Sequence, residues 1–419
     1  MIKRRNSRLL AAAATAALLC ACAPKDGRDA TAKAPASPPA RPLITIDSHD
    51  DIPLDFATPS VDPATADLQV NLDKMKAGGL NAGFFIVYVG QSARTDENYA
   101  KAQADGETKF AAIHRMADEL YPNRIEIAYR AEDVERIAAA GKLVAAIGIE
   151  NGFVLGRNLE KLDKYYELGA RYVTLAHNGN NDLAGSAQPR PELGDPAGAT
   201  MGVTPLGGEA IARMNRLGIM VDISHGSKQT ALDAIRLSAA PVIASHSGIA
   251  GVSVHARNLD DETLRALRDD GGVVQVVAFD AYLRHQSEAE LAALRALREK
   301  VGLAAGGPGA LPPDKRAEYD GGLREIQAQW PPATVKDLVD HIDYAVKLIG
   351  VDHVGISSDF GGGGGVTGWN DAAETGNVTT ELRARGYSDE DIGKIWGGNL
   401  LRVWRAVEAT AAQLKAAAR

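Results

Sequence analysis

Short apolar runs recur along the chain from Leu43 onward, and most of them precede a stretch with helical periodicity, such as residues 209–217 and 259–269. Buried parallel strands appear as continuous apolar runs because helices cover both faces of a parallel sheet. Eight strand–helix units in one chain predict a (β/α)8 TIM barrel, and a doubly wound open sheet is the alternative fold class. The runs that we interpret as strands are residues 43–46, 82–89, 143–149, 172–175, 219–223, 242–244, 273–279 and 353–356.

Two further stretches do not fit a minimal barrel. Residues 281–335 contain a helical segment, a stretch rich in glycine and proline, and a second helical segment. We interpret them as a helical insertion after strand seven, which would lie on the active-site face and shape the substrate pocket. Residues 388–418 have the pattern of one or two amphipathic helices, so the barrel domain is predicted to span residues 43–419.

The first 42 residues have a different character. A positively charged segment is followed by an apolar, alanine-rich stretch that ends in Leu-Cys-Ala-Cys at 19–22. This pattern indicates a secretory signal peptide over residues 1–21, and its end resembles a bacterial lipobox with Cys22 as the lipidated residue. The alternative is an ordinary signal that is cleaved near residue 21 or 23. Residues 22–42 are rich in Ala, Pro and Lys and indicate a flexible tether.

The N-terminal pattern predicts an exported protein that is lipid-anchored to a bacterial membrane, on its periplasmic or extracellular face. No other segment approaches the ~18 uninterrupted apolar residues of a membrane span. Residues 1–21 hold four positive charges and no acidic residue, so cleavage changes the formal net charge from −8 to −12. An acidic body without a basic stripe argues against nucleic acid as a partner. Both cysteines precede residue 23, so a metal site in the domain must use histidine and carboxylate side chains.

Side chains suited to catalysis or metal binding follow six of the predicted strands. In a barrel the carboxyl ends of all strands meet at one mouth, so these side chains should converge. Four of the nine histidines occupy such positions, which random placement would rarely produce. The groups are DSHDD at 47–51 after strand one, Glu150 after strand three, His177 after strand four, His225 after strand five, His246 after strand six and Asp359 after strand eight.

The spacing of these residues predicts a site for two metal ions. His49 and Asp51 lie on one side of an extended segment, which suits one ion. His225 and His246 end neighbouring strands about 5 Å apart and suit a second ion, while Glu150 has two oxygens with which to bridge the pair. Imidazole and carboxylate without thiolate fit Zn²⁺, with Mn²⁺ or Co²⁺ as alternatives. A single histidine at a strand end is more often a hydrogen-bonded loop residue than a ligand, and a single Asp or Glu there is often a helix cap, but five matching positions favour metal.

The same segments resemble the membrane (renal) dipeptidase family, peptidase family M19, a branch of the amidohydrolase-like barrels. The resemblance extends over about residues 43–410, and the motifs occur in the family's order and spacing. The matching motifs are DSHDDIP (47–53), GIENG (148–152), YVTLAHN (172–178), VDISH (221–225), VIASHS (242–247), ARN (256–258), VGISSDF (354–360) and NLLRV (399–403).

This resemblance implies a zinc-dependent dipeptidase with two Zn²⁺ ions, in which a metal-bridging hydroxide attacks the peptide bond. Members of the family often accept a D-residue at the C-terminal position, so dipeptides of mixed chirality are expected among the substrates. The sequence leaves open whether the protein forms a homodimer. The implied roles are metal binding by His49, Asp51, Glu150, His225 and His246, contact with the scissile carbonyl by His177, binding of the substrate's C-terminal carboxylate by Arg257, and proton transfer by Asp359.

Two positions depart from the family pattern. Gly361 stands where the family usually has a second Asp after the Asp-Phe pair of strand eight, and Phe153 stands where many members have His. If the second carboxylate matters, the activity would be reduced or altered. The glycine run at 361–365 lacks the Lys-Ser/Thr pair of a phosphate loop, so it predicts a tight or flexible turn beside the site.

Two other function classes fit part of the pattern. A phosphotriesterase- or lactonase-like binuclear hydrolase typically bridges its metals with a carboxylated lysine, but this chain offers Glu150 as the bridge and His177 after strand four. A non-catalytic peptide-binding lipoprotein would keep Arg257 and could lose a metal ligand or Asp359. This chain keeps all of them, so the dipeptidase is the favoured interpretation.

Overall fold

The computed structural model describes residues 43–303 and 311–418, so the predicted signal peptide, the tether and Cys22 lie outside the described residues. Eight parallel strands form one sheet, in which each strand pairs with its neighbours in chain order. These strands are β1 (Ile46–Asp51), β2 (Ala82–Tyr88), β4 (Leu143–Glu150), β5 (Ala170–Thr174), β6 (Met220–Asp222), β7 (Ile243–Ile249), β9 (Val273–Val277) and β10 (Val354–Ser357).

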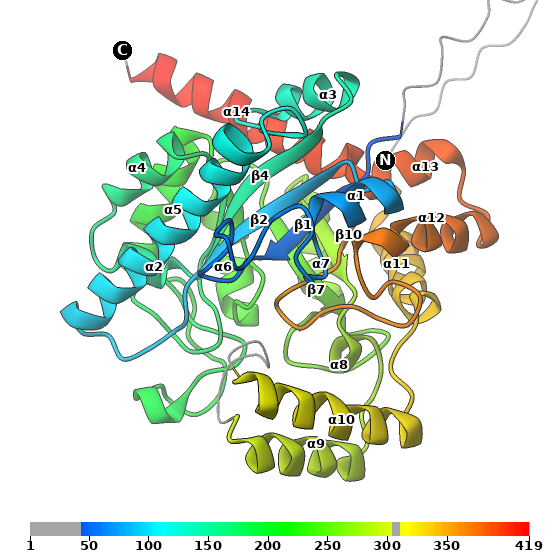
Figure 1. Cartoon of the computed structure of the whole chain (residues 1–419). Helices are drawn as coiled ribbons and strands as arrows, with labels where there is room; N and C mark the ends of the chain where they lie inside the picture. The colour runs from blue at the N-terminus through cyan, green and yellow to red at the C-terminus, as the bar shows by residue number, and fades with distance from the viewer. Residues whose placement is uncertain (1–42, 304–310, 419) are drawn as a thin grey trace, which may run out of the picture. The chain divides into compact units, whose positions relative to one another are not determined.

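The sheet closes into a barrel where its first strand meets its last. Asp50 of β1 forms a parallel bridge with Phe360, just after β10, and the Asp51 amide donates to the Phe360 carbonyl oxygen at 2.7 Å. Helices connect the strands on the outside of this barrel (Figure 1). The predicted (β/α)8 barrel is therefore confirmed, and the alternative of an open doubly wound sheet is wrong.

Two strands extend further toward the mouth than the apolar pattern predicts. Strand β1 covers 46–51 instead of 43–46, and β7 covers 243–249 instead of 242–244. The polar residues that were expected to follow these strands lie inside them, and both His49 and His246 are buried. The apolar pattern ends early because the mouth of the barrel is filled by polar side chains rather than by Val, Ile and Leu.

Two short strands were not predicted at all. Strand β3 (Ile125–Ile127) pairs with β4, and β8 (Asn258–Leu259) pairs with β7. Segments of two or three residues are too short to show the period of two that marks a strand. They add edges to the barrel sheet without changing the order of its eight main strands.

Several helices begin where the local sequence supplies a cap. Helix α5 starts after Thr204, whose side chain accepts a hydrogen bond from the Gly207 amide, and it ends at Gly218 in the left-handed conformation. The helices are α1 (Leu72–Gly78), α2 (Asp96–His114), α3 (Ala131–Ala139), α4 (Lys161–Glu167), α5 (Pro205–Leu217), α6 (Lys228–Leu237), α7 (Asp261–Asp269), α8 (Asp280–Leu283), α9 (Glu288–Val301), α10 (Pro313–Gln329), α11 (Val335–Ile349), α12 (Thr375–Ala384), α13 (Asp389–Gly393) and α14 (Asn399–Ala417).

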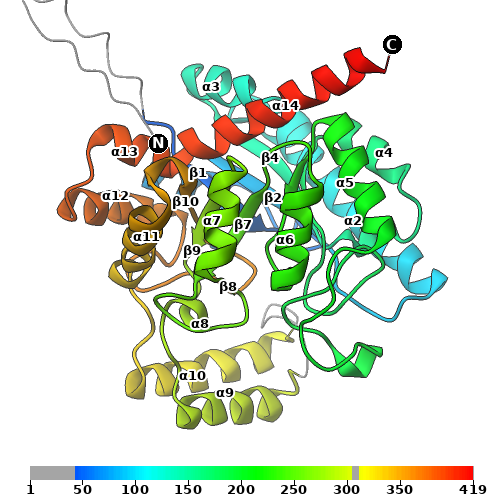
Figure 2. The ribbon, with the colours of Figure 1, turned by 180° about the vertical axis from the view of Figure 1, so that it is seen from behind.

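The stretch predicted as an insertion forms a helical hairpin of α9 and α10. The two helices share a small apolar cluster of their own, built around Leu297 and Tyr319, which is separate from the barrel core. The base of the hairpin is held by Arg284, which pairs with Asp280 at 2.7 Å and with Glu290. Figures 1 and 2 both show the hairpin at the end of the molecule opposite α14.

Helix α14 covers the end of the barrel at which the strands begin. Its Trp404 is fully buried, and the ring centroid lies 5.7 Å from that of Phe84 on β2. Phe84 in turn contacts Tyr172 on β5, with ring centroids 5.2 Å apart. This end of the barrel is therefore an apolar core, closed by a helix that Figure 2 shows across the strands.

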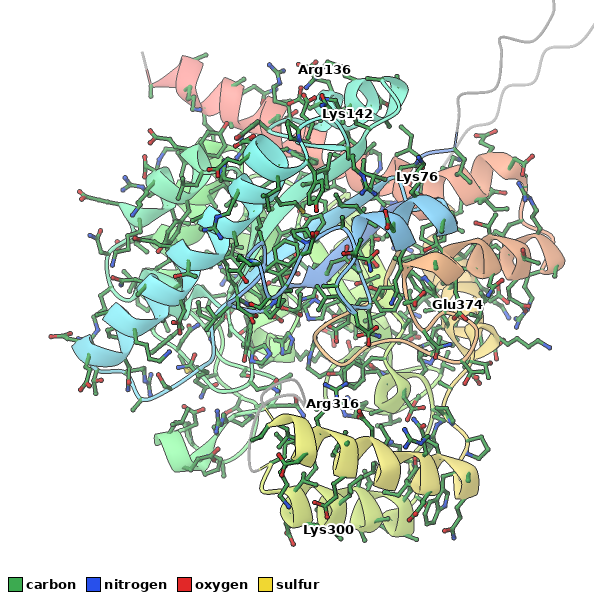
Figure 3. The ribbon with its side chains drawn as sticks, viewed as in Figure 1. Lys76, Arg136, Lys142, Lys300, Arg316 and Glu374 are labelled. Atoms are coloured by element: carbon green, nitrogen blue, oxygen red, sulfur yellow. The ribbon has the colours of Figure 1, made fainter. Side chains whose placement is uncertain are left out.

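Charged side chains lie on the outer surface of the barrel and on the hairpin (Figure 3). Arg136 and Lys142 both pair with Glu126, at 2.9 and 3.2 Å, while Lys300 pairs with Glu318 at 3.2 Å. Exposed pairs of this kind contribute only about 0–1 kcal/mol each, so they do not fix the fold. Among the helices that the structure describes, none has both the length and the apolar character needed to cross a membrane.

Candidate metal centre

Histidine and carboxylate side chains in or just after six strands converge at the end of the barrel where the strands finish. Each of three groups offers donor atoms that all lie within 4.8 Å of one another. Because neighbouring groups share a residue, they form one continuous cluster rather than three separate sites. The groups are His49, Glu150 and His246; Glu150, His177 and His225; and His49, Asp51 and Asp359.

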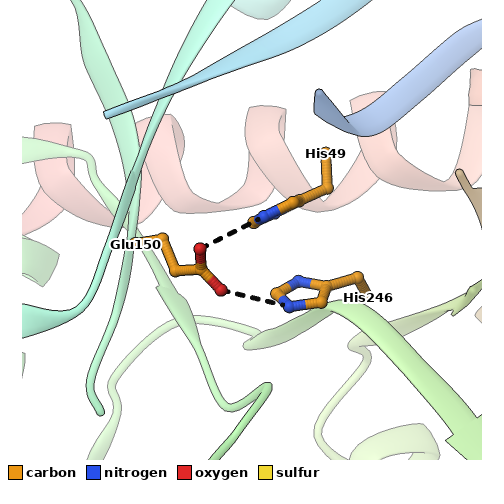
Figure 4. Close-up of side chains that lie close together, drawn as sticks. All are labelled: His49, Glu150 and His246. Atoms are coloured by element: carbon orange, nitrogen blue, oxygen red, sulfur yellow. Dashed lines mark ion pairs between the residues drawn. The ribbon is translucent and has the colours of Figure 1, made fainter. Parts of the chain in front are cut away.

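Glu150 occupies the centre of this cluster. Its Oε2 atom lies 3.5 Å from His49 Nε2, while Oε1 lies 3.0 Å from His225 Nε2 and 3.3 Å from His246 Nε2. Figure 4 shows the carboxylate between His49 and His246, with one oxygen directed to each ring. The two oxygens therefore face different histidines, as a bridging ligand requires.

The donor set fits a bound cation. His225 Nε2 and His246 Nε2 lie 2.9 Å apart, and burial lowers the pKa of both imidazoles well below the usual value, so both rings are neutral near pH 7. Two neutral ring nitrogens and the Glu150 oxygen thus converge with no positive charge among them. His49 Nε2 and Asp51 Oδ1 are also buried, and neither has a hydrogen-bond partner among the described residues. Such orphaned donor atoms fit metal ions.

Asp359 lies at the edge of the cluster, next to His49. Its Oδ1 atom is 3.8 Å from His49 Nε2, and its side chain is about one-tenth exposed. Burial raises the pKa of this carboxyl well above the usual value; His49 opposes the shift, and the neighbouring carboxylates Asp51 and Glu150 add to it. A carboxyl group that takes up a proton so readily is suited to proton transfer.

Two cationic or ionisable side chains complete the mouth. His177 Nε2 is 3.8 Å from Glu150 Oε1, and burial lowers the pKa of its ring. Arg257 is buried and donates from Nη2 to the His246 carbonyl oxygen at 3.0 Å. Its Nε atom has no hydrogen-bond partner in the described part of the chain, and its guanidinium lies 5.4 Å from the centroid of the Tyr282 ring. Arg257 thus has hydrogen-bonding capacity left for a ligand.

The backbone at the mouth is strained at three positions. Asn151, His225 and Asp359 have φ values of 80°, 64° and 58°, in the left-handed region that favours glycine. Each of them is a candidate site residue or directly follows one. A conformation of this kind costs of order 1–3 kcal/mol, so the surrounding contacts must hold it in place.

The glycine run after β10 wraps around the two carboxylates of the mouth. Gly361 has a φ of 79°, and a Cβ atom there would lie 2.4 Å from the Asp51 carbonyl oxygen. A Cβ atom on Gly362 would lie 2.5 Å from both Asp359 Oδ1 and Asp51 Oδ2. The run forms a tight turn, and position 361 has no room for a Cβ atom.

The structure brings the predicted metal ligands together with His177 and Asp359 at one mouth, but the sequence pattern does not indicate their neighbours. Tyr88, at the end of β2, lies 4.9 Å from the His177 ring, and Tyr282 lies beside Arg257. The His255 ring lies 4.6 Å from that of Tyr282 and is tilted by 32° against it. Tyr88 could have been predicted as a site residue because it lies at a strand end. Tyr282 could not, because it lies on α8, beyond any strand end.

Comparisons with known proteins agree with this geometry. The family model "Membrane dipeptidase (Peptidase family M19)" matches residues 37–418. The chain is 32% identical to Dipeptidase tcpJ of Claviceps purpurea over 351 residues, which cover 83% of this chain and 71% of that protein. The crystal structure of the probable dipeptidase PvdM from Pseudomonas aeruginosa is 38% identical, covers 88% of this chain and 96% of its own, and superposes with a TM-score of 0.78.

A more distant neighbour shares the fold. It is a metallo peptidase from Rhodobacter sphaeroides, 20% identical, with a TM-score of 0.66 and coverage of 87% of this chain and 99% of its own. The family match spans all of the described residues and includes every candidate ligand. The chain belongs to the membrane dipeptidase family, peptidase family M19, and is a metal-dependent dipeptidase.

Proposed function

We propose that this dipeptidase binds two Zn²⁺ ions at the mouth of the barrel, with Glu150 as the ligand shared by both. His49 and Asp51 would complete one position, and His225 and His246 the other. The observation that carries the proposal is the orientation of Glu150, whose two oxygens face His49 on one side and His225 and His246 on the other. Nitrogen and carboxylate donors without thiolate suit Zn²⁺.

The bound ions would supply a water molecule activated for attack near neutral pH. Asp359, with its raised pKa, holds a proton beside His49 and can pass it to the leaving amine. His177 is neutral because burial lowers its pKa, so its ring N–H can donate to the carbonyl oxygen as negative charge develops there. The chain's own side chains thus cover proton transfer and stabilisation of the oxyanion.

Arg257 would select dipeptides by binding the substrate's C-terminal carboxylate. Its guanidinium is fixed against the His246 carbonyl oxygen, so it lies directly beside a candidate ligand. The planar guanidinium can bind both carboxylate oxygens at once, which favours a free C-terminus over a continuing peptide.

We also propose that the C-terminal residue of the substrate can be a D-residue. The Rhodobacter sphaeroides neighbour is described as liganded with a phosphinate mimic of the dipeptide L-Ala-D-Ala. That description applies to the neighbour, with which this chain shares the fold. For this chain the proposal is supported by the family to which it belongs.

The test is to purify the protein, measure its bound metal, and assay L,L-dipeptides, L,D-dipeptides and a tripeptide with and without chelator. We expect about two zinc ions per chain and cleavage of both dipeptide series that chelator abolishes and zinc restores. The tripeptide should not be cleaved, whereas Arg257→Leu should raise KM for dipeptides more than it changes kcat. Activity that survives complete metal removal, or equal cleavage of tripeptides, would contradict the proposal.

We propose further that Cys22 is lipidated and anchors the exported protein to a bacterial membrane. The support is the sequence pattern of residues 1–22, because these residues lie outside the described structure. In a bacterial host grown with labelled palmitate, Cys22→Ser should abolish labelling, while the matched control Cys20→Ser should retain it. Equal labelling of the two variants would disprove the lipobox interpretation.

A further inference from the structure

We propose that three residues outside the ligand set, Tyr172, Ser245 and Asn178, position the histidine ligands by fixing which ring nitrogen carries the proton. A neutral imidazole binds metal only through its unprotonated nitrogen, so the hydrogen bond made by the other nitrogen decides the orientation of the ligand. This inference rests on the proposed function, because it concerns the same metal centre. It adds the residues that prepare that centre for the metal.

Tyr172 fixes His49. The Tyr172 hydroxyl has a single proton, and it donates this proton to the Ser48 carbonyl oxygen at 3.0 Å. The same hydroxyl oxygen lies 2.9 Å from His49 Nδ1, so the remaining hydrogen bond must be donated by the ring. His49 therefore carries a proton on Nδ1, so Nε2, which faces Asp51 and Glu150, is the nitrogen left for a metal.

Ser245 fixes His246 by the same logic. The Ser245 hydroxyl donates its proton to Asp222 Oδ2 at 2.6 Å and lies 2.8 Å from His246 Nδ1. His246 Nδ1 must then be the donor, which leaves Nε2 free to face Glu150. Asp222 is fully buried and also accepts from the backbone amides of Ser224 and Ser245, at 3.0 and 2.8 Å, so its side chain is held in place behind the serine.

Asn178 completes the set at His225. Its amide oxygen lies 3.0 Å from His225 Nδ1, and an amide oxygen can only accept a hydrogen bond. All three rings therefore donate outward from Nδ1 and direct Nε2 into the cluster. The acceptors differ in kind: a phenol oxygen, a serine oxygen polarised by a carboxylate, and an amide oxygen.

The three acceptors prepare the ligands before any metal arrives. Without them, each ring could rotate or move its proton to Nε2, which would block the nitrogen that faces Glu150. Losing such an outer partner typically weakens metal binding by about 10–100-fold. Tyr172 supports His49 and Ser245 supports His246, so each substitution should weaken a different one of the two proposed metal positions.

Two matched controls are available in the same barrel. Tyr165 and Ser357 each carry a buried hydroxyl that has no hydrogen-bond partner among the described residues. Tyr165→Phe and Ser357→Ala thus remove the same atoms as Tyr172→Phe and Ser245→Ala, but without removing a contact to a histidine. The phenyl ring of Tyr172→Phe keeps the packing against Phe84, so the barrel core is preserved.

The experiment measures the zinc affinity of both positions in the full chain by competition with a chromophoric chelator. Tyr172→Phe and Ser245→Ala should each weaken one of the two ions by about 10–100-fold, while both controls stay within about twofold of the unmodified protein. Ser245→Thr, which keeps the hydroxyl, should restore the affinity. Affinities in the two test variants equal to those of the controls would overturn the inference.

A second readout is independent of affinity and activity. In the zinc-loaded protein with ¹⁵N-labelled histidine, NMR should show protonated Nδ1 and metal-bound Nε2 at His49, His225 and His246. Coordination through Nδ1 at any of the three would overturn the inference for that residue, even with full dipeptidase activity. If the unmodified protein binds no zinc, the proposed function itself fails, so the two failures are distinguishable.

Discussion

The two ends of this barrel are built from opposite kinds of residue. Where the strands begin, helix α14 closes an apolar core in which Trp404 packs on Phe84 (Figure 2). Where the strands end, buried histidines and carboxylates fill the mouth around Glu150 (Figure 4). The backbone at the mouth is also unusual, since Asn151, His225 and Asp359 adopt left-handed conformations there.

The difference teaches that stability and chemistry are separated along the barrel axis. The apolar end gains free energy from burial, and its residues follow the usual preference for apolar interiors. Buried polar groups and strained backbone at the mouth lower the free energy of unfolding. They persist because hydrogen bonds and packing hold them in place. A substitution should therefore affect either activity or unfolding, according to the end at which it lies.

The largest effect is expected from removing the charge of the bridging residue. Glu150→Gln keeps the size of the side chain but offers only one strong acceptor oxygen, so it should lose metal and lower kcat/KM by about 10³-fold or more. The matched control at the other end is Glu408→Gln, because Glu408 is half-buried and accepts from the Ala131 amide at 3.2 Å. Metal analysis and steady-state kinetics on both variants check the prediction. A comparable loss of metal and of kcat/KM in Glu408→Gln would contradict the difference between the two ends of the barrel.

A large effect of the opposite kind is expected at the apolar end. Trp404→Ala should lower the free energy of unfolding by about 3–5 kcal/mol, because it leaves a cavity beneath α14. The folded fraction should keep its metal content and its kcat. Urea unfolding together with kinetics on the folded protein tests this, and Trp404→Phe serves as a milder variant if the alanine variant does not fold. A fall in kcat for the folded protein would show that the two ends are coupled.

A smaller effect is expected from one methyl group at the mouth. Gly362→Ala places a Cβ atom against both Asp359 and Asp51, so these carboxylates must move and kcat/KM should fall by up to about 10²-fold. Gly376→Ala is the control, because nothing lies within 4 Å of the Cβ it would add. That control lies in helix α12 and should raise stability by about 0.5–1 kcal/mol without changing the kinetics. If Gly362→Ala and Gly376→Ala had the same kcat/KM, the glycine turn would not constrain Asp359 and Asp51 as described.

The smallest effect concerns pH at the end where the strands begin. Burial raises the pKa of Asp270 from 3.8 to about 6, against a hydrogen bond from the Val242 amide. The folded protein therefore holds this proton more tightly than the unfolded chain, and the stabilising contribution is complete below pH 3.8 and lost as pH rises through 6. Asp270→Asn has no such loss, so it should gain about 1–2 kcal/mol over the unmodified protein between pH 4 and pH 7.

Comparing the two proteins by urea unfolding at each pH isolates Asp270, because the titrating groups of the mouth are the same in both. Dipeptidase activity should have the same pH dependence in both proteins. A stability difference that does not change with pH would show that this carboxyl titrates normally. A shifted activity profile would instead show that the charge is felt at the mouth.

Most of the fold could be predicted from the sequence because its strands are continuous apolar runs, which parallel barrels require. The eight strands and their chain order follow from that pattern alone. Their ends could not be located, since β1 and β7 continue through the polar residues around His49 and His246. Strands β3 and β8 are too short to show any period, and only their pairing with longer strands reveals them.

The candidate site divides in the same way. The sequence shows that polar residues follow the strands, and barrel geometry then brings Glu150, His225 and Asp359 to one mouth. It does not show that Tyr172 contacts His49, since the two are 123 residues apart and Tyr172 reads as an ordinary core residue of a strand. It also could not show that position 361 has no room for a Cβ atom, because the obstacle is the carbonyl oxygen of Asp51 in β1.

The sequence by itself thus determined the barrel, the residue types at its mouth and the family. These depend on local hydrophobic patterns and on motifs whose order survives without knowledge of the contacts. Only the tertiary structure decided which nitrogen of each histidine faces Glu150, how the glycine turn encloses Asp359, and which end of the barrel α14 closes. Those features depend on hydrogen bonds and steric contacts between distant segments, and such contacts leave no periodic signal along the chain.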